Sequence, residues 1–197
     1  LFDIICWKTY SKMNKKSNEV VIVAAARTPI GTYKGSLKYI KADQLGSVVI
    51  KEVIKRAEIN SNEINEVILG QVLTSGAGQN PARQASINAG LAKSIPSYLV
   101  NQVCGSGLRS VISGFQTIKL KEAKYIISGG QENMSIAPHV LFYHKDKKLS
   151  EDKLIDTMIY DGLMDAFNNY HMGVTAENIA EKLKISREEQ DDFALKS

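Results

Sequence analysis

The chain has 197 residues, of which 44% are hydrophobic and 23% are charged, which is typical of a globular protein with one sizeable core or two small domains. The formal net charge is +4, but residues 1–18 hold four lysines against one aspartate, so the rest is nearly neutral and has no basic face for nucleic acid. No apolar run approaches the roughly 20 residues of a membrane span, which argues against a membrane protein.

The first 18 residues match neither a signal peptide nor an expected first strand. Met13 is a plausible natural start, because the polar residues after it lead into a clear strand pattern. We therefore expect residues 1–18 to form a tail, and we expect deletion of residues 1–12 to leave the fold unchanged.

Apolar runs then alternate with helical patterns. Strands are predicted over residues 20–24, 67–69, 98–103 and 125–127, as continuous apolar runs typical of strands buried on both faces. The intervening helices are indicated by three features: apolar residues at i, i+4 spacing from Leu45 to Ala57, a cap at Asn80 followed by Pro81, and apolar positions between Leu108 and Ile118. This order predicts an α/β fold with a mixed, mainly parallel sheet between helical layers.

After the last predicted strand the pattern loses its regularity. We expect Gly129 and Gly130 to form a tight turn, and residues 131–170 to be partly irregular. Ser186 and Glu189 form a capping box that opens a final helix, and no glycine cap follows it before Ser197. The expectation is that the chain is part of a longer protein.

The two cysteines, Cys6 and Cys104, lack the close spacing of a zinc site, and no secretory signal precedes them. We therefore expect a reducing, cytoplasmic setting, no disulfide framework and no metal site.

Cys104 lies between a predicted buried strand and a predicted helix. The N-terminus of a helix offers unpaired N–H groups and the positive end of its dipole, which favour the thiolate form of a cysteine. Gly105 and Gly107 lack Cβ atoms and would let a substrate carbonyl or a neighbouring backbone approach closely. The same pattern also fits a buried, inert cysteine beside a tight turn. On the residues alone, a nucleophile and a structural cysteine are equally supported.

Five motifs follow one another along the chain. They are residues 25–31 (AARTPIG), 78–84 (GQNPARQ), 101–107 (NQVCGSG), 129–135 (GGQENMS), and 161–163 with 170–177 (DGL and YHMGVTAE). From about residue 19 to its end, the chain resembles the thiolase family, with its closest similarity to the biosynthetic acetyl-CoA acetyltransferases. This resemblance implies that residues 19–133 are the N-terminal α/β domain and that residues 134–197 begin the loop domain, without the C-terminal domain.

The resemblance also implies a covalent mechanism. Cys104 would take an acetyl group from acetyl-CoA, and a second acetyl-CoA would condense with it to give acetoacetyl-CoA, with thiolysis as the reverse. Leu163, His171 and Met172 match positions that line the pantetheine and acyl pocket. The resemblance further implies that coenzyme A thioesters are substrates, that no cofactor is needed, and that the intact protein is a homodimer or tetramer.

Other interpretations stay open. Leu163 and Met172 also fit core packing, and His171 also fits a hydrogen-bonded structural histidine. The Gly-His-Pro, Cys-x-Gly and Asn-Glu-Ala-Phe motifs, which supply the family's acid-base and oxyanion groups, do not occur in the 197 residues. The chain alone is therefore expected to be inactive. The alternatives are another condensing enzyme, such as a ketoacyl synthase, and a truncated or degraded product without catalytic activity.

Overall fold

A computed structural model describes residues 4–10, 19–141 and 154–197 of the chain, so Met13 lies outside the described residues. The chain divides into two compact units, Leu1–His139 and Val140–Ser197. The first unit contains a five-stranded sheet and its helices, and the described part of the second unit is mainly helical.

The sheet of the first unit has the strand order β2-β1-β5-β3-β4. Its strands are β1 (Ile4–Tyr10), β2 (Glu19–Ala26), β3 (Glu66–Gly70), β4 (Ser97–Val100) and β5 (Tyr125–Gly130). β3 is parallel to β4 and β5, whereas β1 is antiparallel to both of its neighbours. All strands except β1 therefore point the same way, which confirms the prediction of a mixed, mainly parallel sheet.

β1 differs from the sequence-based expectation. It lies between β2 and β5, where Ile5 pairs with Ala25 on one side and with Ser128 on the other. The expectation of a tail outside the fold is therefore wrong for residues 4–10. The physical reason is that the Ile, Trp, Thr and Tyr residues of Ile4–Tyr10 favour strand structure, and this run completes the sheet by pairing with both β2 and β5.

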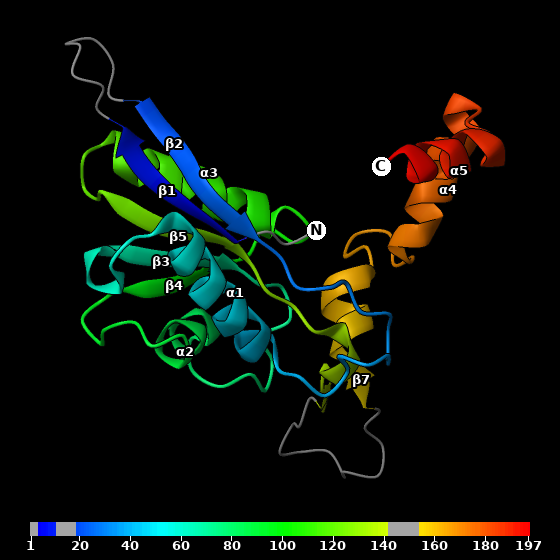
Figure 1. Cartoon of the computed structure of the whole chain (residues 1–197). Helices are drawn as coiled ribbons and strands as arrows, with labels where there is room; N and C mark the ends of the chain where they lie inside the picture. The colour runs from blue at the N-terminus through cyan, green and yellow to red at the C-terminus, as the bar shows by residue number, and fades with distance from the viewer. Residues whose placement is uncertain (1–3, 11–18, 142–153) are drawn as a thin grey trace. The chain divides into compact units, whose positions relative to one another are not determined.

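Helices cover both faces of the sheet (Figure 1). α1 (Ala42–Ala57) and α2 (Pro81–Asn88) pack on one face and on each other, and α3 (Ser106–Lys119) packs on the opposite face. The predicted start of α2 is confirmed, because the side-chain oxygen of Asn80 accepts the N–H of Arg83 at 3.1 Å. Capping of this kind typically stabilises a helix by about 1 kcal/mol.

β3 is buried on both faces, as predicted. Val67 and Leu69 contact the larger core cluster beneath α1 and α2, which includes Val53. Ile68 points to the opposite face and packs with Ile118 of α3. The side chains of Val67, Ile68 and Leu69 are fully buried, and each contributes roughly 1.5–3 kcal/mol relative to an exposed position. This two-sided burial fixes β3 and, through it, the adjoining ends of β4 and α3.

Three local predictions differ from the structure. β2 is an edge strand and is not buried on both faces, since Ile22 is 50% exposed. The strand predicted over 98–103 ends at Val100, where the chain turns toward α3. Gly129 and Gly130 do not form a tight turn: both belong to β5 and pair with the last residues of β3.

Among the described residues from His139 onward, a short two-stranded sheet is followed by helical segments. β6 (His139–Val140) pairs with β7 (Ile155–Asp156), and a π-helix over Met158–Leu163 follows. α4 (Met172–Leu183) and α5 (Arg187–Lys196) come next, and neither contains a buried residue. The predicted capping box is confirmed, because the hydroxyl of Ser186 accepts the N–H of Glu189 while the Glu189 carboxylate accepts the N–H of Ser186.

Candidate active site

Cys104 lies in a short turn between β4 and α3, which we call the Cys104 turn (residues 101–105). Its thiol is free and the residue is exposed. Within the described residues, Cys104 is therefore not a buried cysteine. Two residues after it, α3 begins, so the thiol lies near a helix N-terminus whose first N–H groups lack partners within the helix.

Two successive backbone hydrogen bonds, each between residues three positions apart, stabilise the Cys104 turn. The N–H of Gly105 donates to the carbonyl of Gln102 at 3.0 Å, and the N–H of Ser106 donates to the carbonyl of Val103 at 3.1 Å. A Cβ on Gly105 would lie only 3.3 Å from the Gln102 carbonyl oxygen. Glycine therefore allows the tight approach that the sequence pattern indicated at this position.

A second glycine, which sequence reasoning missed, fixes the start of α3. Gly70 ends β3, and a Cβ there would lie 2.4 Å from the carbonyl carbon of Ser106 and 2.6 Å from the nitrogen of Gly107. The absence of a side chain lets the α3 N-terminus contact the sheet directly. Only the tertiary contact shows why glycine is needed here.

An apolar surface continues from the Cys104 turn along α3. Val103 is 50% exposed and Leu108 is 68% exposed, while Ile112 and Phe115 on the same helix are each 39% exposed. The periodicity of α3 is amphipathic as predicted, with Ile118 buried, but this part of its apolar pattern contacts solvent. Exposed apolar patches of this kind mark surfaces that associate with other protein.

Leu163, His171 and Met172 lie in the second unit. An isolated antiparallel bridge joins Met164 to His171, which brings the three residues into one local region. Leu163 is half-buried, whereas His171 and Met172 are exposed. His171 is the N-cap of α4, and its Nδ1 accepts the N–H of Gly173 at 2.9 Å.

The motif over residues 129–135 forms hydrogen bonds that hold the loop after β2, a role that its sequence did not indicate. The side-chain amide of Asn133 donates to the carbonyls of Lys38 at 3.1 Å and Ile40 at 2.7 Å. The hydroxyl of Ser135 accepts the N–H of Lys34 at 2.9 Å. These contacts join positions more than 90 residues apart and hold the loop that follows β2.

Glu132 in the same motif forms hydrogen bonds to the segment that follows β3. Its carboxylate accepts the N–H of Val72 at 2.8 Å and the N–H of Leu73 at 3.3 Å. Burial raises the pKa of Glu132 from 4.5 to about 7, against the lowering effect of these two hydrogen bonds. Glu132 also lines a pocket of about 290 Å³ with the loop that contains Arg27 and Tyr33.

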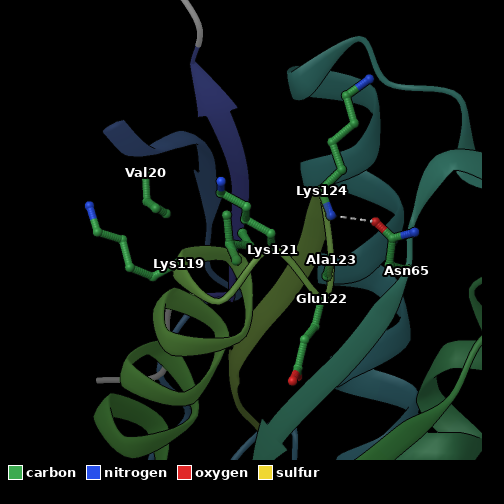
Figure 2. Close-up of a pocket in the computed structure, with 8 residues that line it drawn as sticks. Val20, Asn65, Lys119, Lys121, Glu122, Ala123 and Lys124 are labelled. Carbon is green, nitrogen blue, oxygen red and sulfur yellow. Dashed lines mark hydrogen bonds between the residues drawn. The ribbon is translucent and has the colours of Figure 1, made fainter. Parts of the chain in front are cut away.

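Another pocket, of about 250 Å³, lies where α3 leads into β5 (Figure 2). It is lined by Val20, Asn65, Ile118, Lys119, Lys121, Glu122, Ala123 and Lys124. The side-chain oxygen of Asn65 accepts the N–H of Lys124 at 2.8 Å, as Figure 2 shows. The 14 residues of α3 span about 20 Å between this pocket and the Cys104 turn, so it is separate from the candidate site.

Within the described residues, no group of three or more His, Cys, Asp or Glu side chains has the arrangement of a metal site. None of the helices in that part of the chain is long and apolar enough to cross a membrane.

Comparison with known proteins identifies the family. The thiolase N-terminal domain matches residues 20–197. An acetyl-CoA acetyltransferase of Paracoccus denitrificans is 52% identical over 179 residues, which cover 91% of this chain and 46% of that protein. The cytosolic acetyl-CoA acetyltransferase of Rattus norvegicus is 48% identical over 185 residues, which cover 94% of this chain and 47% of the rat protein. A probable acetyl-CoA acetyltransferase of Escherichia coli (strain K12) is 52% identical over 180 residues, which cover 91% of this chain and 46% of the E. coli protein.

The chain thus spans about half the length of the curated relatives it matches. The matched region includes both the Cys104 turn and the segment that contains Leu163, His171 and Met172. The chain belongs to the thiolase family.

Proposed function

We propose that this chain supplies the acyl-accepting part of an acetyl-CoA C-acetyltransferase, with Cys104 as the nucleophile. The observation that carries the proposal is the exposed thiol of Cys104, placed between the carboxyl end of a parallel strand and the N-terminus of α3. In parallel α/β sheets, ligands bind beyond the carboxyl ends of the strands. Membership of the thiolase family supports the same assignment.

The first step forms an acetyl-Cys104 thioester. The Cys104 thiolate attacks the carbonyl carbon of acetyl-CoA, a new carbon–sulfur bond forms, and the bond to the coenzyme A sulfur breaks. Coenzyme A leaves as a thiolate and takes up the proton that Cys104 released. Because one thioester replaces another, this step is nearly isoenergetic and needs only the nucleophile and its substrate.

The second step is the condensation of acetyl-Cys104 with another acetyl-CoA to give acetoacetyl-CoA, and thiolysis is its reverse. This step needs a base for the methyl proton of acetyl-CoA, which typically contributes 10²–10⁴-fold in rate, and oxyanion donors that contribute roughly 10²–10³-fold. The three family motifs that carry these groups do not occur in the 197 residues. We propose that they come from another polypeptide segment and that the apolar surface of α3 contacts it.

Leu163, His171 and Met172 are proposed to line the pantetheine and acyl pocket. The Nδ1 of His171 accepts a backbone N–H, so neutral His171 carries its proton on Nε2. This atom could donate to a carbonyl of the pantetheine arm. Residues 134–197 would then be the start of the loop domain.

The remaining parts of the proposal concern the intact protein. We expect acetyl-CoA and coenzyme A as its small-molecule partners, no cofactor or metal, and a homodimer or tetramer. A cytoplasmic location is supported by the similarity to the cytosolic acetyl-CoA acetyltransferase of Rattus norvegicus.

The experiment is an assay of acetoacetyl-CoA thiolysis, followed by its absorbance. The chain is assayed alone and after co-expression with the C-terminal half of the Paracoccus denitrificans relative, with Cys104→Ala as the control. Turnover only in the co-expressed sample, lost in Cys104→Ala, supports the proposal. Turnover by the chain alone would show that the second half is not needed, and a co-purified, folded pair without turnover would contradict the proposed activity.

A further inference from the structure

The residue before Cys104 has a backbone conformation that its side chain disfavours. Val103 has φ = 47°, in the left-handed region. A β-branched residue is a genuine outlier there, because its Cβ branch crowds the backbone. Strained residues of this kind persist only when surrounding contacts hold them. The contacts that hold Val103 therefore also set the position of Cys104, which follows it directly.

Two side chains bind the peptide groups on either side of Val103. The side-chain oxygen of Asn101 accepts the N–H of Val103 at 3.0 Å. The hydroxyl of Ser106 donates to the carbonyl of Val103 at 2.6 Å and accepts the N–H of Gln102 at 2.8 Å. The Val103 carbonyl lies in the same planar peptide group as the Cys104 nitrogen, so fixing the carbonyl also fixes the Cys104 backbone.

Ser106 itself is firmly placed. It is 1% exposed, and its backbone lies against Gly70 at the end of β3. Its hydroxyl has one proton, which the Val103 carbonyl accepts, so the hydroxyl bridges two backbone groups of the Cys104 turn. Because the backbone of Ser106 packs against the sheet, its two hydroxyl hydrogen bonds hold the exposed Cys104 turn in a fixed position relative to the sheet.

We propose that Ser106 is a positioning residue for Cys104: its hydroxyl holds Val103 in the left-handed conformation that presents the thiol to an acyl donor. This inference rests on the proposed function of Cys104 as the acyl acceptor. It predicts that removing the hydroxyl lets the turn relax toward ordinary backbone angles and moves the thiol away from its reactive position. A misplacement of about 1 Å can cost up to 10²-fold in rate.

The test compares Ser106→Ala with Ser110→Ala in the full chain. Ser110 is a matched control, because it is also fully buried on α3 and its hydroxyl accepts the N–H of Gly129 at 2.9 Å, away from the Cys104 turn. Two rates are measured at Cys104: alkylation by iodoacetamide and acetylation by acetyl-CoA. Ser106→Ala should slow both by roughly tenfold or more, whereas Ser110→Ala should leave both within about twofold. Circular dichroism confirms folding of each variant.

A second comparison separates positioning from a purely structural role. Glycine adopts positive φ without strain, so Val103→Gly should make the Ser106 hydroxyl less necessary. In that background, Ser106→Ala should slow alkylation by no more than about threefold, a coupling that independent effects would not show. If Ser106→Ala does not fold, Asn101→Ala is used instead, because Asn101 is exposed and holds the other peptide group of Val103.

Equal slowing by Ser106→Ala and Ser110→Ala, or the same slowing with and without Val103→Gly, would overturn the inference. The alkylation rate does not depend on acetyl-CoA. A chain that shows the predicted alkylation pattern but is never acetylated would therefore contradict the proposed function while supporting the positioning role.

Discussion

The carboxylate of Glu132 accepts the backbone N–H of Val72 at 2.8 Å and so joins the end of β5 to the segment that follows β3. Burial raises the pKa of Glu132 from 4.5 to about 7, although the hydrogen bonds from Val72 and Leu73 oppose this change. The contact therefore depends on pH within a range that is easily measured.

The first prediction is that Glu132 makes the chain less stable as pH rises from about 4.5 to 7. In this interval the folded carboxyl keeps its proton while the unfolded one loses it, so the folded state binds more protons and stability falls with pH. The difference in unfolding free energy between wild type and Glu132→Gln should fall by at most about 3 kcal/mol, reduced by whatever water reaches the site. Urea unfolding at several pH values measures it.

Glu63→Gln is the control for this series, because Glu63 is an exposed carboxylate of the same unit. The pH-dependent change for Glu132→Gln should exceed the change for Glu63→Gln. A difference from wild type that stays constant with pH for Glu132→Gln would contradict the raised pKa of Glu132.

The second prediction concerns the close approach of α3 to β5. A Cβ on Gly114 would lie 2.5 Å from the hydroxyl of Ser128, so Gly114→Ala should destabilise the chain by about 1–3 kcal/mol. The Ser128 hydroxyl is buried and has no hydrogen-bond partner among the described residues, so Ser128→Ala should be neutral or stabilising. The double variant should recover most of the loss, because it removes the clash and gains the helix propensity of alanine.

Urea unfolding of the two single variants and the double variant measures this coupling. Strictly additive effects would show that the two groups do not meet.

The third prediction is that β1 is part of the folded sheet. Deleting residues 1–10 removes the strand that pairs with both β2 and β5, so the melting temperature should fall by roughly 5 °C or more. Deleting residues 187–197 is the control, because α5 contains no buried residue. Thermal unfolding by circular dichroism gives both values. Equal, small shifts for the two deletions would show that β1 contributes nothing to the fold.

The fourth prediction concerns the apolar surface of α3. Replacing Leu108 and Phe115 by lysine should reduce association of the chain with the C-terminal half of the Paracoccus denitrificans relative, without loss of helical signal, because both side chains contact solvent in the described structure. Leu195→Lys on α5 is the control, since Leu195 is 86% exposed outside this surface. Sedimentation velocity compares the variants. An unchanged distribution of species for Leu108→Lys with Phe115→Lys would show that α3 is not the associating surface.

The sequence predicted the parts of the fold that local patterns determine. The apolar run over 67–69 and the cap at Asn80 each depend on neighbouring residues, and both appear as expected. β1 was not predicted, although its residues favour strand structure, because its place inside the sheet also depends on pairing with β5, where Ser128 lies opposite Ile5. The helical pattern that begins at Leu108 identified an amphipathic helix, but periodicity alone does not show which apolar side chains are covered within this chain.

The candidate site was predictable in the same sense. The order of strand, cysteine and helix indicated where Cys104 lies, and glycine indicated a tight approach. The left-handed conformation of Val103 was not predictable, because a β-branched residue argues against it and the contacts that hold it form only in the folded turn. The role of Gly70 was hidden for the same reason.

Acetyl transfer from acetyl-CoA followed by peptide mapping tests whether Cys104 accepts an acetyl group. The full chain is incubated with acetyl-CoA, quenched in acid, digested and examined by mass spectrometry, with Cys6→Ser and Cys104→Ser as matched variants. We expect one hydroxylamine-sensitive acetyl group on the peptide that contains Cys104, present in Cys6→Ser and absent in Cys104→Ser. A folded chain that gains no acetyl group at Cys104, or equal labelling of Cys104→Ser, would contradict it.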